Sequence, residues 1–409
     1  MSESGNISST NKKCQICVGC GRCGNVASGL HVITESFLKP ELLSVGETVD
    51  KGSFVLADIG TTTIAMELYD ETGQKLEEYV CPNPQRIFGA DVISRIQSAE
   101  NAMHARQMQA LVRGVLEKGL QQFELSKYMQ KQKIKKMYIA GNTTMLNLLC
   151  GHDVRPLGYA PFQADFLESE ELSIGDVLAV TLPGLSAFVG GDIVAGILAT
   201  GMHKRKEISL LLDLGTNGEM VLGNCDRMIA CSTAAGPAFE GMLQSRGKAA
   251  WGADLVKYAA LLLQHGFMDE TGLLQEPYFT EGITIGDTCI TQDLIRKLQT
   301  AKAAITAGIE VLVQEYGMDT VERIDKVYLA GGFGYYLQVE AAVRIGLLPQ
   351  VVQGKTQSVG NSALAGCYYY HINSRAKQEL KIIQKKAEVI NLAEMEAFTW
   401  KFVENMSFK

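Results

Sequence analysis

The chain has 409 residues, of which 46% are hydrophobic and 20% charged, so it can bury a substantial core and is not expected to be disordered. Because single cores stop growing near about 250–300 residues, this length favours two packed domains. The net charge of -7 and the lack of a lysine- and arginine-rich block argue against a nucleic-acid partner. The polar stretch 1–11 lacks the apolar core of a secretory signal, and glycines and Asp192 interrupt the apolar stretch 182–202. We therefore expect a cytoplasmic protein without disulfides and without a membrane partner.

Residues 1–50 contain the sharpest local pattern of the sequence, a C-x2-C-x2-C-x2-C run formed by Cys14, Cys17, Cys20 and Cys23. A segment of this size is hard to stabilise by burial alone, so a metal is expected to hold it together. Structural zinc sites usually separate two Cys-x2-Cys pairs by a longer loop, whereas bacterial ferredoxins use a compact run to hold a [4Fe–4S] cluster. The spacing favours such an iron–sulfur cluster, with zinc as the alternative, and a cluster shared between two copies would make the protein a homodimer.

The other six cysteines, at positions 81, 150, 225, 231, 289 and 367, show no metal-ligand spacing, and neither do the six histidines. We expect these cysteines to act as small buried hydrophobic residues.

The pattern of residues 51–375 predicts regular α/β structure, and the same order of elements occurs twice in it. Residues 54–58 and 64–69 predict two strands joined by a turn at 59–63, and residues 210–213, 214–218 and 219–222 repeat this hairpin around a shared Asp–X–Gly–Thr. Apolar periodicity predicts helical structure from 91 to roughly 130 and again over 291–316. Strands at 136–140 and 326–330 follow, each with a glycine turn and a helix start. We predict an internal duplication, with two similar domains facing each other across a cleft.

The glycine turns suit a nucleotide, because a backbone without Cβ atoms can approach a ligand closely and successive N–H groups form a nest for an anion. We predict that two turns clamp the phosphates of ATP from opposite sides and that a third forms a flat floor for the nucleoside. The phosphate residues are Gly60, Thr61, Thr62, Thr63, Gly215, Thr216, Asn217 and Gly218, and the nucleoside residues are Gly331, Gly332, Phe333 and Gly334. The sequence has no P-loop and no Rossmann glycine fingerprint after a strand.

Asp58 and Asp213 end their predicted strands at the cleft, so we predict them as catalytic residues. A hydrated Mg²⁺ binds through one or two carboxylates, and an aspartate in this place can also orient the attacking water. Asp192 follows two glycines and has two interpretations that the sequence does not separate. It is either the cap of a helix N-terminus or a third carboxylate near the metal.

Several stretches together resemble the ATPase region of the reductive activators of corrinoid proteins. The matching stretches are 57–63, 89–96, 141–145, 188–196, 212–219, 234–241, 330–334, 346–349 and 359–364, and the resemblance covers roughly 54–370. It implies duplicated actin-like (ASKHA, ribonuclease H-like) α/β ATPase domains around a nucleotide cleft, with a small iron–sulfur module in front. It also implies a redox function, in which the protein uses ATP to pass a low-potential electron to the cob(II)alamin of a corrinoid methyltransferase protein, with a donor such as ferredoxin.

The chain departs from the family pattern in two places. The family usually begins with a plant-ferredoxin-like [2Fe–2S] domain and a linker domain, whereas only a short segment precedes Asp58 here. After Gly241 a longer insert is expected, but the chain runs through residues 247–251 directly into a predicted helix.

These observations give a domain division and three alternative functions. We predict an iron–sulfur module at 1–50, ATPase subdomains at 51–205 and 206–375, and a charged C-terminal tail at 376–409. The alternatives are an activator of another low-potential enzyme of the 2-hydroxyacyl-CoA dehydratase type, a small-molecule kinase with a structural zinc module, and an actin-like assembly protein.

Overall fold

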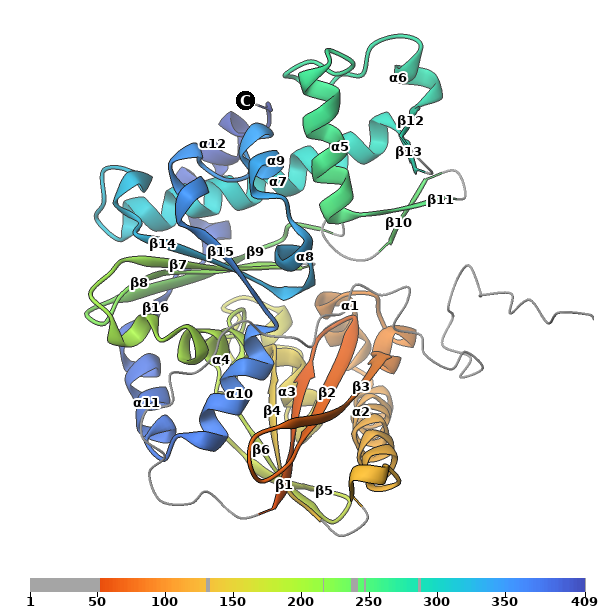
Figure 1. Cartoon of the computed structure of the whole chain (residues 1–409), viewed down its shortest axis with the longest axis vertical. Helices are drawn as coiled ribbons and strands as arrows, with labels where there is room; N and C mark the ends of the chain where they lie inside the picture. Colours follow the sequence, from red (N-terminus) through yellow and green to blue (C-terminus); the bar gives the residue numbers. More distant parts are fainter. Residues whose placement is uncertain are drawn as a thin grey trace, which may run out of the picture.

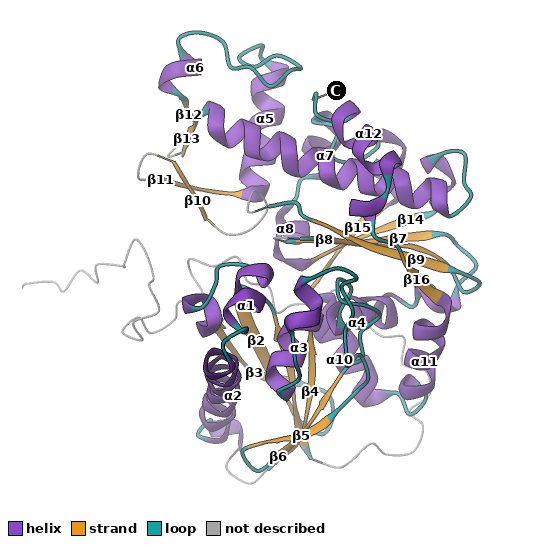
Figure 2. Cartoon of the chain, turned by 180° about the vertical axis from the view of Figure 1, so that it is seen from behind, coloured by secondary structure: helices purple, strands orange, loops and turns teal. Residues whose placement is uncertain are grey.

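The computed structural model describes residues 52–129, 133–215, 217–236, 242–245, 248–285 and 288–408. Within them, two six-stranded sheets form the centres of two lobes (Figures 1 and 2). The first sheet contains β1 (Ser53–Ile59), β2 (Thr63–Tyr69), β3 (Lys75–Pro82), β4 (Ile134–Gly141), β5 (Glu171–Ile174) and β6 (Val177–Thr181), in the order β3-β2-β1-β4-β6-β5. The second contains β7 (Ser209–Leu214), β8 (Gly218–Gly223), β9 (Met228–Thr233), β14 (Lys326–Ala330), β15 (Thr356–Gly360) and β16 (Ala387–Val389), in the order β15-β14-β7-β8-β9-β16.

The two sheets share the arrangement of five strands, β3-β2-β1-β4-β6 and β9-β8-β7-β14-β15, and differ in the edge that the sixth strand joins. This confirms the predicted hairpins and the α/β fold. In each sheet, an antiparallel hairpin continues into a third strand, and a later strand pairs parallel to the first strand of the hairpin. Asp58 is in register with Ala140, and Asp213 is in register with Ala330. Each aspartate therefore lies beside the strand end that leads into a glycine turn.

Helices connect and cover these sheets. They are α1 (Val92–Ser98), α2 (Ala102–Glu124), α3 (Thr143–Cys150), α4 (Gly191–Thr200), α5 (Gly252–Gln264), α6 (Tyr278–Glu281), α7 (Gln292–Glu315), α8 (Gly331–Tyr336), α9 (Val339–Arg344), α10 (Ser362–Ile372), α11 (Ala376–Lys386) and α12 (Glu396–Glu404). The helical stretch predicted from 91 divides where Asn101 caps α2, while 291–316 forms the single helix α7 behind the cap Thr291. None of the described helices is long and apolar enough to cross a membrane.

Two short ribbons flank α5 and α6. One pairs β10 (Met242–Ser245) with β11 (Lys248–Trp251), and the other pairs β12 (Ile283–Ile285) with β13 (Thr288–Ile290). The helix predicted after residue 251 is present, but a hairpin stands directly before it. The sequence does not predict the β10–β11 hairpin, because each strand has only four residues and so short a segment shows no detectable periodicity of its own.

Strand alternation sorts the side chains of both sheets into three apolar clusters. In β1, Val55, Ala57 and Ile59 face the cluster covered by α1, α2 and α3, whereas Phe54 and Leu56 face a middle cluster with α4, α10 and α11. Leu211 of β7 faces the same middle cluster from the other sheet, and its strand neighbours face a third cluster under α5, α7, α9 and α12. Because side chains alternate along a strand, Asp58 and Asp213 both point toward the middle helices.

The middle layer depends on a close contact between α4 and α10. A Cβ at Gly366 of α10 would lie 2.2 Å from the carbonyl oxygen of Ala195 in α4, and one at Gly196 would lie 2.9 Å from Ser362 Oγ. The small residues thus let the two helices pack closely between the sheets, as Figure 1 shows for α4 and α10.

We predict that Gly366→Ala destabilises the protein by about 1–3 kcal/mol, because the added methyl group meets backbone and forces the helices apart. Gly114→Ala is the matched control, since Gly114 lies exposed in α2 with open space around it and alanine there should stabilise by up to about 1 kcal/mol. Urea unfolding midpoints of both variants test this. An unchanged midpoint for Gly366→Ala would contradict the packing described.

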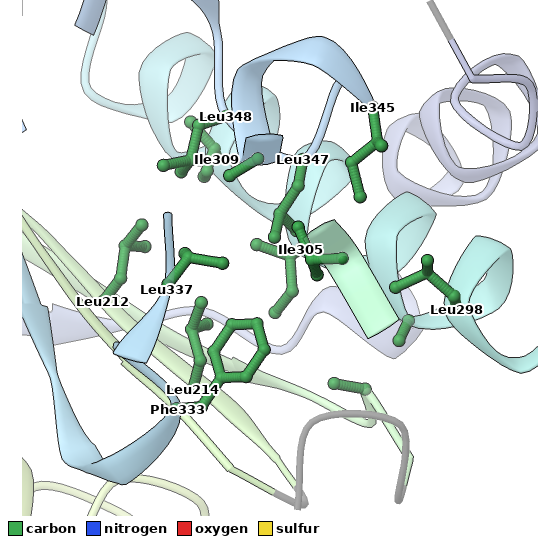
Figure 3. Packing of buried hydrophobic residues seen from close by; sticks show 14 of the residues in the cluster. Leu212, Leu214, Leu298, Ile305, Ile309, Phe333, Leu337, Ile345, Leu347 and Leu348 are labelled. Atoms are coloured by element: carbon green, nitrogen blue, oxygen red, sulfur yellow. The ribbon is translucent and has the colours of Figure 1, made fainter. Parts of the chain in front are cut away.

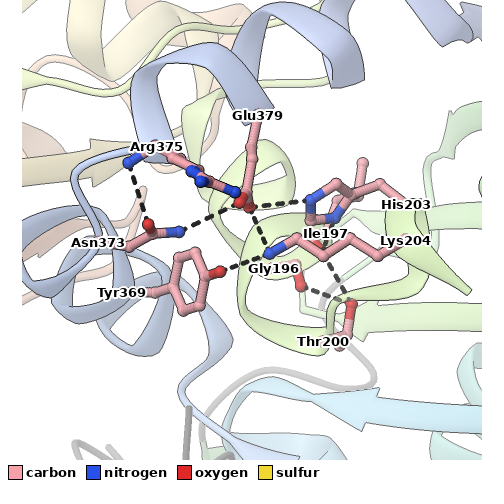
Figure 4. A network of polar contacts seen from close by, with 9 residues as sticks. All are labelled: Gly196, Ile197, Thr200, His203, Lys204, Tyr369, Asn373, Arg375 and Glu379. Carbon is pink, nitrogen blue, oxygen red and sulfur yellow. Dashed lines mark hydrogen bonds and ion pairs between the residues drawn. The ribbon is translucent and has the colours of Figure 1, made fainter. Parts of the chain in front are cut away.

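Residues 376–408, which the sequence sets apart as a tail, fold onto the lobes. The strand β16 pairs parallel with β9, and Lys302 of α7 donates hydrogen bonds of 2.7 Å to the carbonyl oxygens of Asn405 and Ser407. Glu379 of α11 lies within 3.1 Å of His203 Nε2 and 2.7 Å of Lys204 Nζ, and it accepts from Asn373 at 3.1 Å (Figure 4). The segment therefore joins α11 to the end of α4. The domain boundaries themselves remain a prediction.

The Glu379 network predicts a pH-dependent stability. Burial raises the pKa of Glu379, but the hydrogen bonds from His203 and Lys204 outweigh it and lower the pKa from 4.5 to about 2. A lowered carboxyl pKa stabilises the fold above the unfolded value, and this contribution is lost as the pH falls from about 4.5 toward 2. Glu379→Gln should lower stability by about 2 kcal/mol at neutral pH and by progressively less in acid.

Glu388→Gln serves as the control for this measurement, because Glu388 forms an exposed pair with Arg227 and should contribute less than about 1 kcal/mol. Thermal unfolding of both variants between pH 7 and pH 3 would decide. A Glu379→Gln penalty that stays constant over this range would show that the carboxylate charge is not what the network uses.

Candidate nucleotide and metal site

Four carboxylates from four elements gather between the two sheets. Asp58 and Asp213 are the penultimate residues of β1 and β7, and Glu219 stands directly opposite Asp213 on β8. Asp192 lies in the first turn of α4, and its side chain accepts from the neighbouring Ile193 N–H at 2.8 Å. Gly190, not Asp192, occupies the cap position of α4. Asp192 is therefore not the cap of α4, and it lies near enough to Asp58 and Asp213 for their charges to act on it. A role near a metal stays a prediction.

These carboxylates repel one another in a half-buried place. Burial raises the pKa of Asp58 to about 6. Burial, followed by the charges of Asp58 and Asp213, raises the pKa of Asp192 to about 7. Burial and the charges of Asp192 and Asp213 also raise the pKa of Glu219 well above its usual value. The shifts of Asp192 and Glu219 therefore reflect both burial and the charges of neighbouring carboxylates, whereas that of Asp58 reflects burial.

Asn361 links the carboxylates to the middle helices. Its Nδ2 donates to Asp58 Oδ2 at 2.9 Å, and its Oδ1 accepts from Leu364 N–H at 2.8 Å as the cap of α10. One amide thus fixes the start of α10 and the orientation of Asp58, which lies 303 positions away in the chain.

The first predicted phosphate turn is held by polar side chains from outside it. Gly60 N–H donates to Thr63 O at 2.9 Å and closes the turn. The carbonyl of Gly60 accepts from Asn83, Thr61 Oγ1 accepts from Asn142 at 3.0 Å, and Thr61 O accepts from the fully buried Arg95 at 2.6 Å. Because Gly60 N–H is used within the turn, residues 61–63 of this turn stay the candidates for an anion nest.

The second turn is one residue tighter than the first. Ile59 pairs with Ile64 across the first turn, whereas Leu214 pairs with Gly218 across the second, where Gly215 N–H donates to Asn217 O at 2.9 Å. The Asn217 side chain also hydrogen-bonds Glu219. Thr216 lies outside the described residues.

The third glycine turn contributes backbone rather than side chains. Gly331 has a φ of 75°, and a Cβ there would lie 2.6 Å from Asp213 Oδ1, so only glycine brings this turn against the carboxylates. A Cβ at Gly334 would lie 3.0 Å from the Leu329 backbone, which means that this glycine lets α8 pack on β14. The ring of Phe333 is 7% exposed and lies in the apolar cluster with Leu214 and Leu337 (Figure 3). Its side chain therefore packs in the core, and only backbone of residues 331–334, including Gly332, remains a candidate for contact with a nucleoside.

The residues of this site fit Mg²⁺ and a nucleoside triphosphate. Carboxylate oxygens are the protein ligands that Mg²⁺ prefers, and a hydrated ion here would neutralise the repulsion among Asp58, Asp192 and Asp213. Glycine turns from both lobes face this place from β1, β7 and β14. The four N-terminal cysteines, Cys14, Cys17, Cys20 and Cys23, lie outside the described residues.

The sequence predicts Asp58, Asp213 and the glycine turns as site residues, but not five further side chains around them: Asn83, Arg95, Asn142, Asn361 and Glu219. Arg95, Asn142 and Asn361 all lie in stretches that carry the family resemblance. Their roles depend on contacts with Thr61 and Asp58, which are distant in the sequence. Glu219 directly follows the second turn. From the sequence alone, an acidic residue at this place is equally compatible with an exposed position on a strand.

Comparison with known proteins agrees with this architecture. Residues 54–205 match the region described as "RACo middle region", and residues 207–253 and 252–409 match the "C-terminal domain of RACo the ASKHA domain". A solved structure described as a reductive activator for corrinoid, iron–sulfur protein superposes with a TM-score of 0.77 at 30% identity, over 89% of this chain and 67% of that one. The chain belongs to the family of reductive activators of corrinoid proteins.

Two relatives in this family carry names that state what they do. The corrinoid activation enzyme RamQ of Eubacterium limosum is 29% identical over 443 residues, covering 93% of this chain and 74% of RamQ. A reductase of Methanosarcina barkeri, named for the Co(II) methylated amine-specific corrinoid protein, is 23% identical over 380 residues, covering 76% of this chain and 68% of the reductase. The chain is thus an ASKHA-fold enzyme of the reductive activase type, which confirms the resemblance found in the sequence.

The carboxylate cluster predicts a trade-off, in which the same acidic residues lower the stability of the ligand-free protein and favour ligand binding. Since burial and like charges raise the pKa of Asp192 from 3.8 to about 7, the ligand-free protein should lose stability as the pH rises through this range. Asp192→Asn should therefore raise the thermal midpoint at pH 8 by about 3 °C or more, equivalent to about 1 kcal/mol. This gain should begin near pH 4 and be complete above pH 7.

The same variant should lose most of the additional midpoint shift that wild type shows with Mg²⁺ and ATP. Asp176→Asn is the control, because Asp176 is exposed between β5 and β6 and its replacement should change neither quantity. If Asp192→Asn destabilises the ligand-free protein, the electrostatic account of this cluster is wrong.

Proposed function

We propose that this protein is an ATP-dependent reductive activator that passes a low-potential electron to the cob(II)alamin of a corrinoid methyltransferase protein, giving cob(I)alamin. The observation that carries the proposal is the pair of Asp–X–Gly–Thr turns, set against a cluster of four carboxylates, in a chain of the corrinoid-activator family. The four closely spaced N-terminal cysteines support the electron-transfer part of the proposal.

The cleft residues have separate roles in this proposal. Asp58 and Asp213 would hold the hydrated Mg²⁺ or orient the attacking water, with Asp192 as a third carboxylate, while the turns at 60–63 and 215–218 would hold the phosphates. Asn361 ties Asp58 to α10 at 2.9 Å, so a change in the position of Asp58 on ATP binding would also move a middle helix. This contact offers a route from the nucleotide to the relative placement of the two lobes.

ATP is needed because reduction of cob(II)alamin is energetically uphill. Each tenfold change in the equilibrium of a one-electron transfer corresponds to about 59 mV, and ATP binding can supply such a bias only if it favours one conformation over another. An iron–sulfur cluster bound by Cys14, Cys17, Cys20 and Cys23 would supply the electron, and the compact run favours the [4Fe–4S] type.

The remaining elements of the proposal concern location and partners. We infer a cytoplasmic protein that receives electrons from a ferredoxin-like donor and docks a corrinoid protein, and a cluster shared between two copies would require a homodimer.

The proposal predicts that ATP and the cysteine run are both required, at separable steps. In an anaerobic assay, visible spectra would follow the formation of cob(I)alamin in a corrinoid protein with a chemical or protein electron donor. Cys17→Ser/Cys20→Ser should lower the rate by at least about 100-fold while ATP binding stays within about twofold. Asp213→Asn should lower the rate to a similar degree with the iron content unchanged.

The matched control is Cys225→Ser, because Cys225 is a half-buried cysteine on the second lobe, outside the cleft. Stoichiometric zinc without iron in the purified protein would contradict the redox half of the proposal. If the protein reduces a 2-hydroxyacyl-CoA dehydratase but no corrinoid protein, the ATPase part of the proposal stands. The function is then that of the alternative, an activator of another low-potential enzyme.

A further inference from the structure

A second group of metal-ligating side chains lies on the first lobe, away from the carboxylate cluster. Cys150 Sγ, a ring nitrogen of His152 and a carboxylate oxygen of Glu170 all lie within 4.8 Å of one another, and each residue is half-buried. His152 Nε2 is 2.6 Å from Glu170 Oε2. We propose that Cys150, His152 and Glu170 form a site for a single Zn²⁺ ion, independent of the nucleotide cleft and of the N-terminal cysteines.

The local backbone sets the two ligands at the end of α3 side by side. Cys150 is the last residue of α3, and Gly151 caps the helix with a φ of 86°, a left-handed conformation that favours glycine. The N–H groups of Gly151 and His152 both donate to Asn147 O at 2.9 Å. This tight turn brings the imidazole back beside the thiol, so a Cys-x-His spacing becomes a ligand pair.

Glu170 and the imidazole are positioned by contacts that do not involve a metal. The backbone N–H of Glu170 donates to Thr181 Oγ1 at 2.9 Å, and Thr181 N–H donates back to Glu170 O at 3.0 Å. The His152 ring stacks on Phe166 with centroids 4.3 Å apart. The ligands are thus fixed by the end of α3, by Phe166 and by β6, as a preorganised site requires.

The donor set and the spacing suit zinc. Zn²⁺ binds thiolate, imidazole and carboxylate in tetrahedral geometry with bonds of about 2.0–2.3 Å, which place ligand atoms about 3.3–3.6 Å apart. The three ligand atoms lie within 4.8 Å of one another. His152 Nε2 and Glu170 Oε2, now 2.6 Å apart, would move apart as the ion replaces their hydrogen bond. Hard cations such as Mg²⁺ would not select the cysteine.

A neighbouring buried acceptor points to a fourth ligand. Asn147 lies one turn before Cys150 on α3, and both line one small pocket with Thr181. Asn147 is 3% exposed; its Nδ2 donates to the carbonyls of Thr143 and Phe166, while its Oδ1 has no partner. A zinc-bound water in this pocket would donate to Asn147 Oδ1 and satisfy it.

A reactive-cysteine role fits this place less well. Burial and the adjacent Glu170 raise the pKa of Cys150 to about 12, so the metal-free thiol is protonated and a poor nucleophile at neutral pH. A metal ion would change this by replacing the thiol proton.

Cobalt(II) titration of full-length protein tests the proposal, because a thiolate ligand gives a sulfur-to-cobalt charge-transfer band and tetrahedral geometry gives intense visible bands. The four N-terminal cysteines are first replaced by serine in the full chain to remove their contribution. This variant should still bind one equivalent of Co²⁺, displaceable by Zn²⁺. Adding Cys150→Ser should abolish the charge-transfer band, and adding His152→Ala should weaken Zn²⁺ binding by about 100-fold or more.

Cys225→Ser is the matched control, since the thiol of Cys225 also lies near a carboxylate, that of Asp226 at 3.8 Å, but belongs to no such three-ligand group among the described residues. It should leave the spectrum unchanged. If the serine variant fails to fold, wild type and Cys150→Ser are compared directly, and a difference of one tetrahedral equivalent supports the site. An unchanged spectrum in Cys150→Ser, or no binding at micromolar Co²⁺ and Zn²⁺, would overturn it.

Discussion

The alternation of side chains along two equivalent strands is the constraint on which this structure depends. In β1 and β7 the apolar residues divide between an outer and a middle layer, and the penultimate residue of each strand, an aspartate, falls on the middle side. Shifting either strand by one residue would send Asp58 or Asp213 into an outer core, where an unpaired carboxylate is costly. The apolar pattern of each strand therefore also aims the two carboxylates at one place.

The cost of that arrangement is visible in the site. Burial, and after it the charges of neighbouring carboxylates, raise the pKa values of Asp192 and Glu219, and a cation or protons can relieve this repulsion. The surrounding contacts are correspondingly rigid: Arg95, Asn83 and Asn142 fix the first turn, and Asn361 fixes Asp58. A protein that destabilises itself in this way without a ligand gains stability when the ligand binds, which is how nucleotide binding can drive a change of conformation.

The fold could be predicted from sequence because its signals are local and occur twice. Each hairpin shows a short apolar run, a glycine turn and a second apolar run. Because this pattern occurs twice, chance rarely produces it.

The site residues that the sequence does not predict share a different property. Asn361 looks in sequence like an ordinary helix cap, and its contact with Asp58 spans 303 positions. Phe333 shows the converse, because a residue inside a glycine-rich motif turns its ring into the core. The C-terminal segment was also beyond local reasoning, since the three residues Ala387–Val389 add an edge strand through pairing with β9, and so short a run carries no detectable period.

The most direct measurement of the central claim is the ratio of ATP hydrolysed to cob(I)alamin formed in one anaerobic reaction with a corrinoid protein. We expect cob(I)alamin to accumulate only with ATP, in a fixed ratio, and ATP consumption to fall when the corrinoid protein is withheld. Equal formation of cob(I)alamin without ATP, or ATP consumption that depends on a small-molecule phosphate acceptor, would contradict the claim.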